Sequence, residues 1–322
     1  MDIHQGTRAR IGVVGGSGYT GLELLRRLAL HPGVETVFAL SRAEAGQPTP
    51  VPGLAFTAAT PEEFDTVDYL FLCLPHGATE PWIEAGLSSG ARVIDLTADN
   101  RPGSGTTRAA AYGLAEWEAE SVVDAKLVAN PGCYPTGVLT SLRPLHEAGV
   151  LGEGLISIQA ASGVTGAGRS PRRDLLFGEI TGSFKAYGLG NNHRHLREMR
   201  WGLPTRQLLF VPHLLPVERG ILETIVVPVA DGMDAEGVKS IWKARYAGSP
   251  VIRVVDEAPS LRDVTRSDLL LMSAFDNQDL PGVVTLVVAL DNLGKGAAGQ
   301  AIQNMNLMAG MSAEWGLQCA PS

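Results

Sequence analysis

The stretch GGSGYTG, residues 15–21, is the feature that most restricts the fold. It follows a short apolar run at 10–14 and precedes leucines at helical spacing up to Pro32-Gly33. A buried strand, a glycine turn and a helix in this order make a β-turn-α unit. Further apolar runs, separated by helical stretches, predict a Rossmann-type, doubly wound parallel sheet; they lie at 34–40, 67–74, 91–96 and 126–129.

After Gly149 the pattern changes to long apolar runs with few helices between them. The runs expected to be strands are 155–164, 208–217, 221–230, 251–256 and 283–290. One helix is expected over 235–247 and a last, glycine-rich one over 293–310. This half predicts an α+β catalytic and dimerisation domain with a large mixed sheet. The expected domains are residues 1–133, completed by the C-terminal helix 295–322, and residues 134–294.

Composition limits the classes of partner. The 322 residues carry a formal net charge of −8 and no apolar stretch of the roughly 18 residues that span a membrane. We therefore expect small-molecule partners, and neither nucleic acid nor membrane. Three scattered cysteines favour neither a disulfide framework nor a metal site, and they fit a reducing cytoplasm. Residues 1–8 are interpreted as a loose leader.

The glycine stretch also predicts a cofactor. Gly16 to Gly21 read G-x-G-x-x-G between a strand and a helix, which would let the backbone approach a pyrophosphate. An ordinary tight turn is the alternative. At the end of the second strand stand Ser41 and Arg42, where an NAD site would carry an acid. A hydroxyl and a guanidinium suit a 2′-phosphate, which favours NADP.

Cys133, in ANPGCYPT, lies where a strand gives way to a helix. The N–H groups of that helix terminus would lower the pKa of the thiol and favour a nucleophilic thiolate. A small, buried packing residue is the alternative. Because strand carboxyl ends share one edge of a parallel sheet, we expect Cys133 in one crevice with the glycine turn, Ser41 and the Pro75-His76 dipeptide.

Two later stretches could complete a site. The glycine-rich loop 161–169 ends in Arg169, and successive backbone N–H groups beside a guanidinium could cradle an anion. A mobile surface loop is equally compatible with these residues. His193 and His195 flank Arg194 and would share one face of an extended segment. His213, on an apolar strand, is a third candidate with a stronger claim to a structural role.

At this point ten motifs, in order from residue 11 to about 307, resemble N-acetyl-γ-glutamyl-phosphate reductases of arginine biosynthesis, relatives of aspartate-semialdehyde dehydrogenase. They are GGSGYTG, SR, LPHG, IDLTAD, YGLAE, NPGCYPT, SGVTGAGR, AYGLGNNHRH, PHLLPVERGIL and NLGKGAAGQAIQNMN.

The resemblance implies a role for each candidate residue. Cys133 would be the nucleophile, with His195, His193 or His213 as the base. NADP would be held by Gly15, Gly16, Ser17, Gly18, Tyr19, Thr20, Gly21, Ser41, Arg42, Pro75, His76, Asn292, Gly294 and Lys295. The substrate would be held by Ser162, Gly163, Arg169, Tyr187 and Arg101. Asn100 and the stretch 196–199 depart from the family pattern. The resemblance therefore does not identify every residue that forms the wall of the substrate pocket.

The implied reaction is NADPH-dependent reduction of an acyl phosphate through a cysteine thioester, without a metal, in a homo-oligomer that is a dimer or a tetramer. A reductase of a carrier-protein-linked aminoadipyl or glutamyl phosphate in lysine synthesis is the nearest alternative. A non-catalytic NADP-binding redox regulator is an alternative from another class. Such a regulator would not need a cysteine that lies beside paired histidines and an anion-binding loop, so this combination favours an enzyme.

Overall fold

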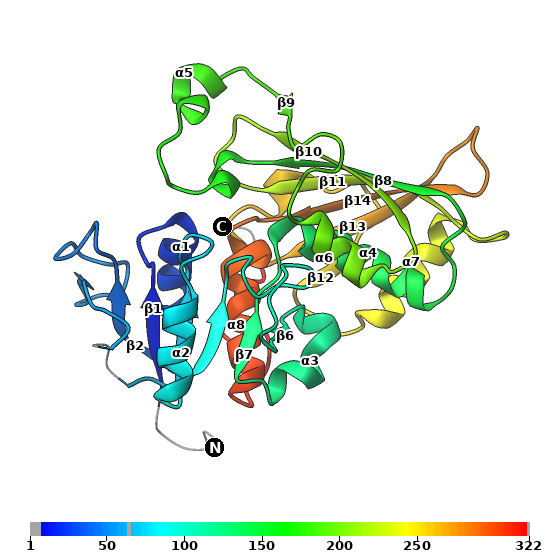
Figure 1. Ribbon diagram of the computed structural model, residues 1–322. Coiled ribbons are helices and arrows are strands. Elements are labelled where there is room, and N and C mark those ends of the chain that lie inside the picture. The colour runs from blue at the N-terminus through cyan, green and yellow to red at the C-terminus, as the bar shows by residue number, and fades with distance from the viewer. Residues whose placement is uncertain (1–7, 63–65, 321–322) are drawn as a thin grey trace. The chain divides into compact units, whose positions relative to one another are not determined.

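The computed structural model describes residues 8–62 and 66–320 (Figure 1). Seven of the eight residues of the expected leader lie outside the described residues. The described chain forms two compact units. The first contains 8–132 and 297–317, and the second contains 133–296 and 318–320. Cys133 is thus the first residue of the second unit.

The first unit is built on a parallel sheet of seven strands in the order β3-β2-β1-β4-β5-β7-β6. Its strands are β1 Ala9–Val14, β2 Val34–Leu40, β3 Phe56–Thr57, β4 Tyr69–Leu72, β5 Arg92–Asp95, β6 Ala111–Tyr112 and β7 Leu127–Ala129. The predicted doubly wound sheet is confirmed. The sequence did not reveal β3 and β6, because two residues are too few for a repeating pattern.

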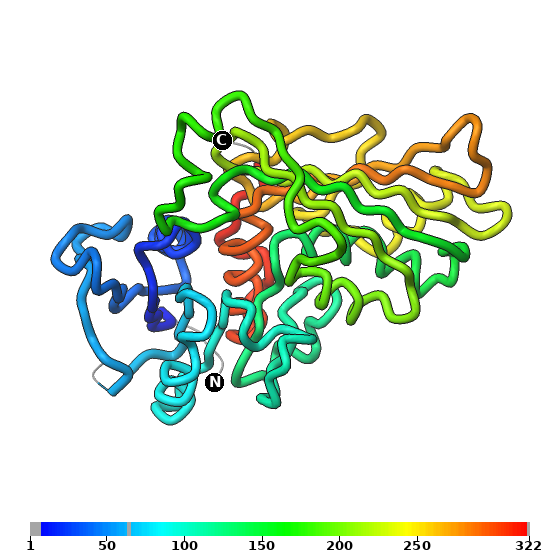
Figure 2. The backbone as a smooth tube through the Cα atoms, turned by 45° about the horizontal axis from the view of Figure 1, so that its top comes forward, coloured from blue at the N-terminus to red at the C-terminus, as the bar shows by residue number. Residues whose placement is uncertain are grey.

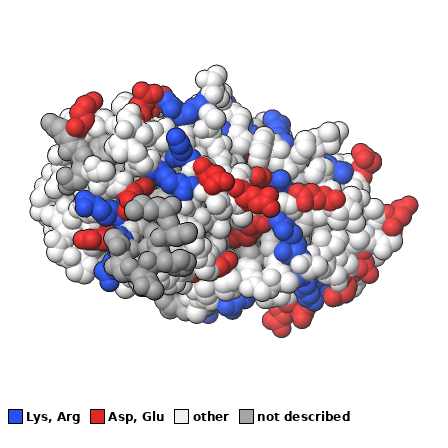
Figure 3. Space-filling model, turned by 90° about the horizontal axis from the view of Figure 1, so that it is seen from below, with Lys and Arg blue, Asp and Glu red and all other residues white. Residues whose placement is uncertain are grey.

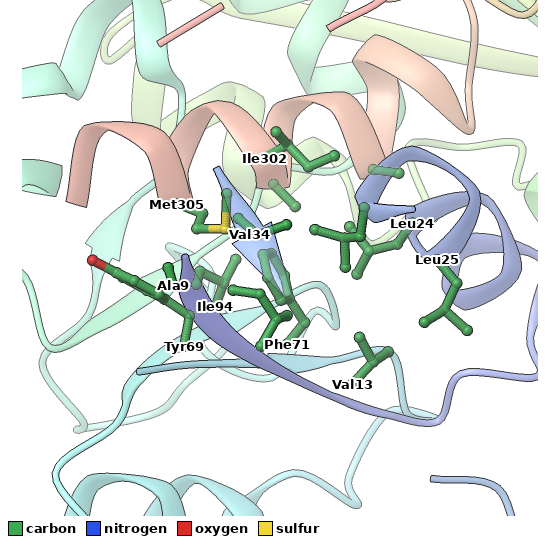
Figure 4. Packing of buried hydrophobic residues seen from close by; sticks show 14 of the residues in the cluster. Ala9, Val13, Leu24, Leu25, Val34, Tyr69, Phe71, Ile94, Ile302 and Met305 are labelled. Carbon is green, nitrogen blue, oxygen red and sulfur yellow. The ribbon is translucent and has the colours of Figure 1, made fainter. Parts of the chain in front are cut away.

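The described residues of this unit form four helices: α1 Tyr19–Leu28, α2 Glu80–Ser88, α3 Ala115–Val123 and α8 Gly299–Met308. The last returns from the far end of the sequence, and Figures 1 and 2 show it in red beside the strands of the first sheet. Ile302 and Met305 of α8 are fully buried in one cluster with Val13, Leu24 and Phe71 (Figure 4). Segments almost 300 residues apart therefore share a core.

The second unit is built on a mixed sheet in the order β12-β13-β14-β11-β8-β10-β9. Its strands are β8 Leu155–Ser162, β9 Lys185–Ala186, β10 Gln207–Leu214, β11 Ile221–Pro228, β12 Ile252–Val254, β13 Leu270–Asp276 and β14 Val283–Leu290. The β8–β10 and β12–β13 pairs are parallel and the other neighbours are antiparallel. The predicted large mixed sheet is confirmed, although β9 and β13 were not anticipated.

The helices of the second unit are α4 Cys133–Glu147, α5 Phe177–Ile180, α6 Leu196–Gly202 and α7 Ala235–Arg245. Short 3₁₀ turns lie at Val164–Ala167, Arg173–Leu175 and Leu261–Asp263, and a π-helical turn, Gly294–Ala298, precedes α8. Trp242 Nε1 donates to Ser141 O at 2.8 Å, and the Tyr246 hydroxyl donates to Thr140 O at 2.6 Å. These bonds fix α4 against the segment that contains α7.

Strand β11 alternates buried and half-buried residues, so its two faces have different surroundings. Glu223 lies on the buried face together with Ile221 and Ile225. A Cβ atom added to Gly137 of α4 would lie 2.2 Å from Glu223 Oε2. A carboxyl group therefore fills the space that the absent side chain of Gly137 leaves.

Charges are mixed on the surface. On the face in Figure 3, acidic and basic side chains lie next to one another. Among the described residues, no helix is long and apolar enough to cross a membrane.

Candidate active site

Cys133 is the first residue of α4, three residues after Asn130 and directly after Pro131-Gly132. The first N–H groups of a helix have no partner within the helix and carry the positive end of its dipole. Pro135, which lacks an N–H, lies in this first turn, where it costs no helical hydrogen bond. The Cys133 thiol is half-buried. The sequence expectation of a cysteine at a helix start is confirmed.

A pocket of about 360 Å³ adjoins the thiol, and its volume lies in the range of small-molecule sites. Described residues from α4, the loop after β8, β9, the segment before α6 and the end of β10 line it. Of the expected catalytic and substrate residues, the pocket brings together Cys133, Ser162, Gly163, Tyr187, His193 and His195.

The two histidines of the pocket differ in environment. Their rings lie 4.8 Å apart, and His193 Nδ1 accepts a hydrogen bond from the His195 backbone N–H at 3.2 Å. Burial, and then the Arg194 guanidinium, lower the pKa of His193 to about 4. His193 is therefore neutral near pH 7. His195 is only 4% exposed and lies at the start of α6.

Tyr134 contacts both histidines and Tyr187 in the pocket. Its ring contacts those of His193 and His195 edge to face, with centroids 5.7 and 5.8 Å apart. Its hydroxyl lies 3.0 Å from the hydroxyl of Tyr187. Burial raises the pKa of both tyrosines, so both hydroxyls stay protonated and can donate hydrogen bonds. The sequence reasoning missed Tyr134, although its position next to the nucleophile was a usable signal.

A buried ion pair, Arg219–Asp291, holds the turn that follows β14. Arg219 Nε is 2.7 Å from Asp291 Oδ2, and the two side chains are 3% and 0% exposed. The Asp291 carboxylate also accepts from the N–H groups of Leu293 and Gly294, and its backbone oxygen accepts from Gly296. A Cβ at Gly296 would lie 2.9 Å from Cys133 Cβ. Asp291 therefore fixes the turn that packs on the cysteine.

The prediction that backbone N–H groups of the loop 161–169 cradle an anion is wrong. Most of its N–H groups donate to backbone carbonyls of the fold: Gly163 to Gly220, Val164 to Val217, Thr165 to Glu218, Gly166 to Gly163 and Gly168 to Thr165. An N–H that is already bonded inside the fold is not available to a ligand. Arg169 does not line the pocket, whereas Arg172, Lys185 and Arg194 do.

His213 lies on the other side of its strand. Leu214 lines the pocket, and successive side chains of a strand point to opposite faces. His213 instead stacks on Phe184, with ring centroids 5.1 Å apart. The structure does not bring His213 together with His193 and His195 in the pocket.

Cys73 and Cys319 are also free thiols among the described residues. Burial, with a smaller contribution from the Asp95 carboxylate, raises the pKa of Cys73 to about 12. Cys73 is therefore a protonated, unreactive thiol near pH 7. Cys319 belongs to a small apolar cluster with Leu222 and Val255.

In the first unit the glycine turn has the geometry of a phosphate site. Gly15 has a φ of +78°, and a Cβ at Gly21 would lie 2.7 Å from the Gly15 oxygen and the Gly16 Cα. Gly18 is the N-cap of α1, and in the described chain no side chain caps this end. The open helix terminus fits a nucleotide pyrophosphate.

The end of β2 meets this turn. Ser41 Oγ lies 2.7 Å from Ser17 Oγ, and Arg42 next to it is exposed. His76 and Pro75 are exposed after β4, and His76 Nδ1 accepts from the Ala98 N–H at 3.0 Å.

Four other expected ligands have structural partners. Asn292 bonds Gly220 N and Thr165 Oγ1, and Gly294 N–H donates to Asp291. Lys295 is fully buried. Arg101 is buried and donates to the backbone oxygens of Asn130 and Leu96. Within 8–62 and 66–320, no group of three or more His, Cys, Asp or Glu side chains is arranged to hold a metal ion.

Comparison with known proteins gives the family. Residues 10–125 match the model described as semialdehyde dehydrogenase, NAD binding domain, and residues 133–292 match semialdehyde dehydrogenase, dimerisation domain. The chain is 38% identical to N-acetyl-gamma-glutamyl-phosphate reductase of Marinobacter nauticus, over 96% of this chain and 97% of that protein. It is 40% identical to the reductase of the same name from Cellvibrio japonicus, with the same coverage. The chain belongs to the N-acetyl-γ-glutamyl-phosphate reductase family.

Members of this family are NAD(P)-dependent oxidoreductases, so the chain is an enzyme that uses a pyridine nucleotide. Solved structures agree in fold. The chain matches aspartate semialdehyde dehydrogenase II of Vibrio cholerae, complexed with ASA, at a TM-score of 0.76 and 19% identity, over 94% of this chain and 98% of that one. It matches the Candida albicans aspartate semialdehyde dehydrogenase with NADP at 0.68 and 16% identity, with the same coverage.

Proposed function

We propose that this enzyme reduces N-acetyl-γ-glutamyl phosphate to N-acetylglutamate semialdehyde and phosphate with NADPH, through a thioester on Cys133, in arginine synthesis. One observation carries the proposal. Cys133, at the start of a fifteen-residue helix, lines a pocket that it shares with buried His195 and neutral His193. A nucleophile, a base and a ligand-sized space are the minimum for acyl transfer.

In the first step His195 takes the proton of the Cys133 thiol, and the thiolate attacks the γ-carbonyl carbon. Backbone N–H groups at the start of α4 stabilise the oxyanion that develops on the carbonyl oxygen. The carbon–oxygen bond to phosphate then breaks and leaves a thioester on the sulfur. The protonated Tyr134 and Tyr187 hydroxyls are further donors in this part of the pocket.

In the second step the thioester carbon accepts a hydride, which NADPH supplies when it is bound. Collapse of the tetrahedral oxyanion breaks the carbon–sulfur bond and releases the aldehyde. His195 returns its proton to the departing Cys133 sulfur, and the phosphate takes one proton from solvent. The Ser17–Ser41 pair, the adjacent Arg42 and the uncapped start of α1 support NADP as the cofactor, because a guanidinium suits the 2′-phosphate.

The test is to add the acyl phosphate without NADPH and to analyse the intact protein and its peptides by mass spectrometry. We expect an acyl group on Cys133 and none on Cys73 or Cys319. Cys133→Ser should lose acylation and turnover and still bind NADPH, because a serine alkoxide is far harder to form than a thiolate.

Acylation of another residue, or turnover by the serine variant, would contradict the assignment. A redox regulator would bind NADPH without forming the thioester. A reductase of carrier-linked substrates would be acylated only by the acyl phosphate presented on its carrier protein.

The second sheet supports a homo-oligomer. Its strands alternate buried and half-buried residues, and half-buried apolar side chains of neighbouring strands share one face, namely Leu209, Val211, Leu222, Val226, Val283 and Val287. Half-buried apolar residues on one sheet face are typical of a surface that a second copy covers.

A further inference from the structure

Three cationic side chains and one carboxylate line the pocket beside Cys133: Arg172, Lys185, Arg194 and Asp174. The proposed substrate carries two anionic groups, an acyl phosphate at one end and an α-carboxylate at the other. The inference below rests on that proposed function, and it concerns which cation meets the carboxylate.

The register of β9 fixes the direction of Lys185. Lys185 lies directly opposite Leu214 of β10 in an antiparallel pair, and such partners point to the same side of the sheet. Leu214 lines the pocket, so Lys185 extends on the pocket side. The pairing continues to Tyr187, whose N–H donates to Pro212 O at 3.0 Å.

Arg172 has an ion-pair partner, and Arg194 lies at the histidine end of the pocket. Arg172 donates to both carboxylate oxygens of Asp174, from Nε at 3.1 Å and from Nη2 at 2.7 Å. Arg194 lies between His193 and His195 in the chain, and all three line the pocket, so it belongs to the histidine end of the pocket. Among the described residues, Lys185 has no ion-pair partner within 4.0 Å, although, after the hydrogen bonds from Arg172, its charge contributes to the lowered pKa of Asp174.

The distance between Lys185 and Tyr187 along the strand is similar to the length of the substrate. Lys185 precedes Tyr187 by two residues, which is roughly 6.6 Å along a strand. In the extended substrate the α-carboxylate carbon lies roughly 5 Å from the γ-carbonyl carbon, across four carbon–carbon bonds. If the γ-carbonyl group lies at the Cys133 sulfur and close to the tyrosine hydroxyls, the α-carboxylate would extend toward Lys185.

We propose that Lys185 binds the α-carboxylate of the substrate, while the Arg172–Asp174 pair forms the neighbouring wall. Lysine is a flexible point charge, so it can follow a carboxylate in a solvated pocket. Lys185 then selects acyl phosphates that carry an anionic group at this distance from the reacting carbon.

The test uses two substrates and three variants in steady-state assays. The substrates are N-acetyl-γ-glutamyl phosphate and 4-acetamidobutanoyl phosphate, which lacks only the α-carboxylate. In the wild type we expect KM for the second to be about tenfold higher. Lys185→Met should raise KM for the first about tenfold, leave KM for the second within about twofold and change kcat little. Lys185→Arg should recover most of the loss, and Lys243→Met on α7 serves as the matched charge control.

Equal losses for both substrates in Lys185→Met would overturn the inference, since Lys185 would then act on the phosphate or on the structure. No loss for either substrate would overturn it as well. Acylation of Cys133 is measured with the same two compounds. If the wild type forms no thioester with either, the proposed function fails and the inference with it. If the thioester forms and Lys185→Met changes KM equally for the two substrates, only the inference fails.

Discussion

His193 and His195 lie side by side, and burial keeps His193 unprotonated near neutral pH. His193 has a pKa of about 4 and its Nδ1 is occupied by a backbone N–H. We predict that His195→Asn lowers kcat about 10²–10⁴-fold and removes the pH dependence near neutrality. His193→Asn should lower activity less and keep that dependence. Rates measured from pH 5 to 9 for both variants provide the check.

His213→Asn is the control for this prediction, because His213 faces Phe184 on the other side of β10. We expect it to keep the pH dependence of the wild type. If that dependence disappears in the His213 variant and persists in the His195 variant, the base has been misassigned.

Arg42 is the residue that we expect to discriminate between the two nicotinamide cofactors. It is exposed beside the Ser17–Ser41 pair, so solvent weakens its contribution. We predict that Arg42→Ala weakens NADPH binding about tenfold and leaves NADH binding nearly unchanged. Fluorescence titration of each cofactor measures the effect. Equal losses for both cofactors would show that Arg42 does not contact a 2′-phosphate.

At the scale of elements, the contact between β11 and α4 contains a buried acid. Burial raises the pKa of Glu223 well above its usual value of 4.5, and neither carboxyl oxygen has a hydrogen-bond partner among the described residues. The folded protein therefore holds a proton that the unfolded chain releases above pH 4.5. The free energy of unfolding should fall as pH rises from 4.5 toward the folded-state pKa, by up to about 1.4 kcal/mol per pH unit.

Glu223→Gln removes this titration and keeps the shape of the side chain. Urea unfolding at pH 5 and pH 8 should show a smaller loss of stability in the variant than in the wild type. Gly137→Ala should be strongly destabilising, because the added Cβ would meet the Glu223 carboxyl. The same pH dependence in both proteins would mean that Glu223 is ionised in the folded state.

Elements with a regular pattern and sufficient length were predictable. β2 and β14 have the expected bounds, 34–40 and 283–290. β13 was missed because its first five residues are all buried, so they show no alternation. The hydrogen bonding of the loop after β8 was also not predictable, since the partners of three of its N–H groups lie more than 50 residues later, at 217–220. The charged wall of the pocket depends on strand register, which no local pattern encodes.

At the scale of the whole molecule, the first unit depends on the last helix. Ile302 and Met305 are fully buried in its core. We predict that Ile302→Ala lowers the free energy of unfolding by about 2–4 kcal/mol and speeds amide exchange in β1. Leu30→Ala, at a residue 70% exposed, is the control. Leu307, on the same helix as Ile302, is unsuitable as a control, because it is half-buried and packs on this cluster. Equal effects of the two changes would contradict the packing argument.

A second prediction at this scale concerns assembly. Val226→Arg would put a charge on the half-buried face of β11. We expect the wild type to sediment as a dimer or tetramer and the variant to shift toward monomer. Thr57→Arg, at an exposed position of the first unit, is the control. A wild type that sediments as a monomer at micromolar concentration would refute the expectation.

The close approach of Gly296 to Cys133 brings together two of the three places where the chain passes from one unit to the other. The main segment of the second unit, 133–296, is thus an insertion with neighbouring ends, the arrangement in which one folded module can be exchanged for another. A chimera made at 132/133 and 296/297 would transfer the reactive cysteine, its histidines and the pocket as one cassette. The host would keep its glycine turn and its nucleotide preference. We therefore expect recombination between relatives to change the acid that is reduced without changing the source of electrons.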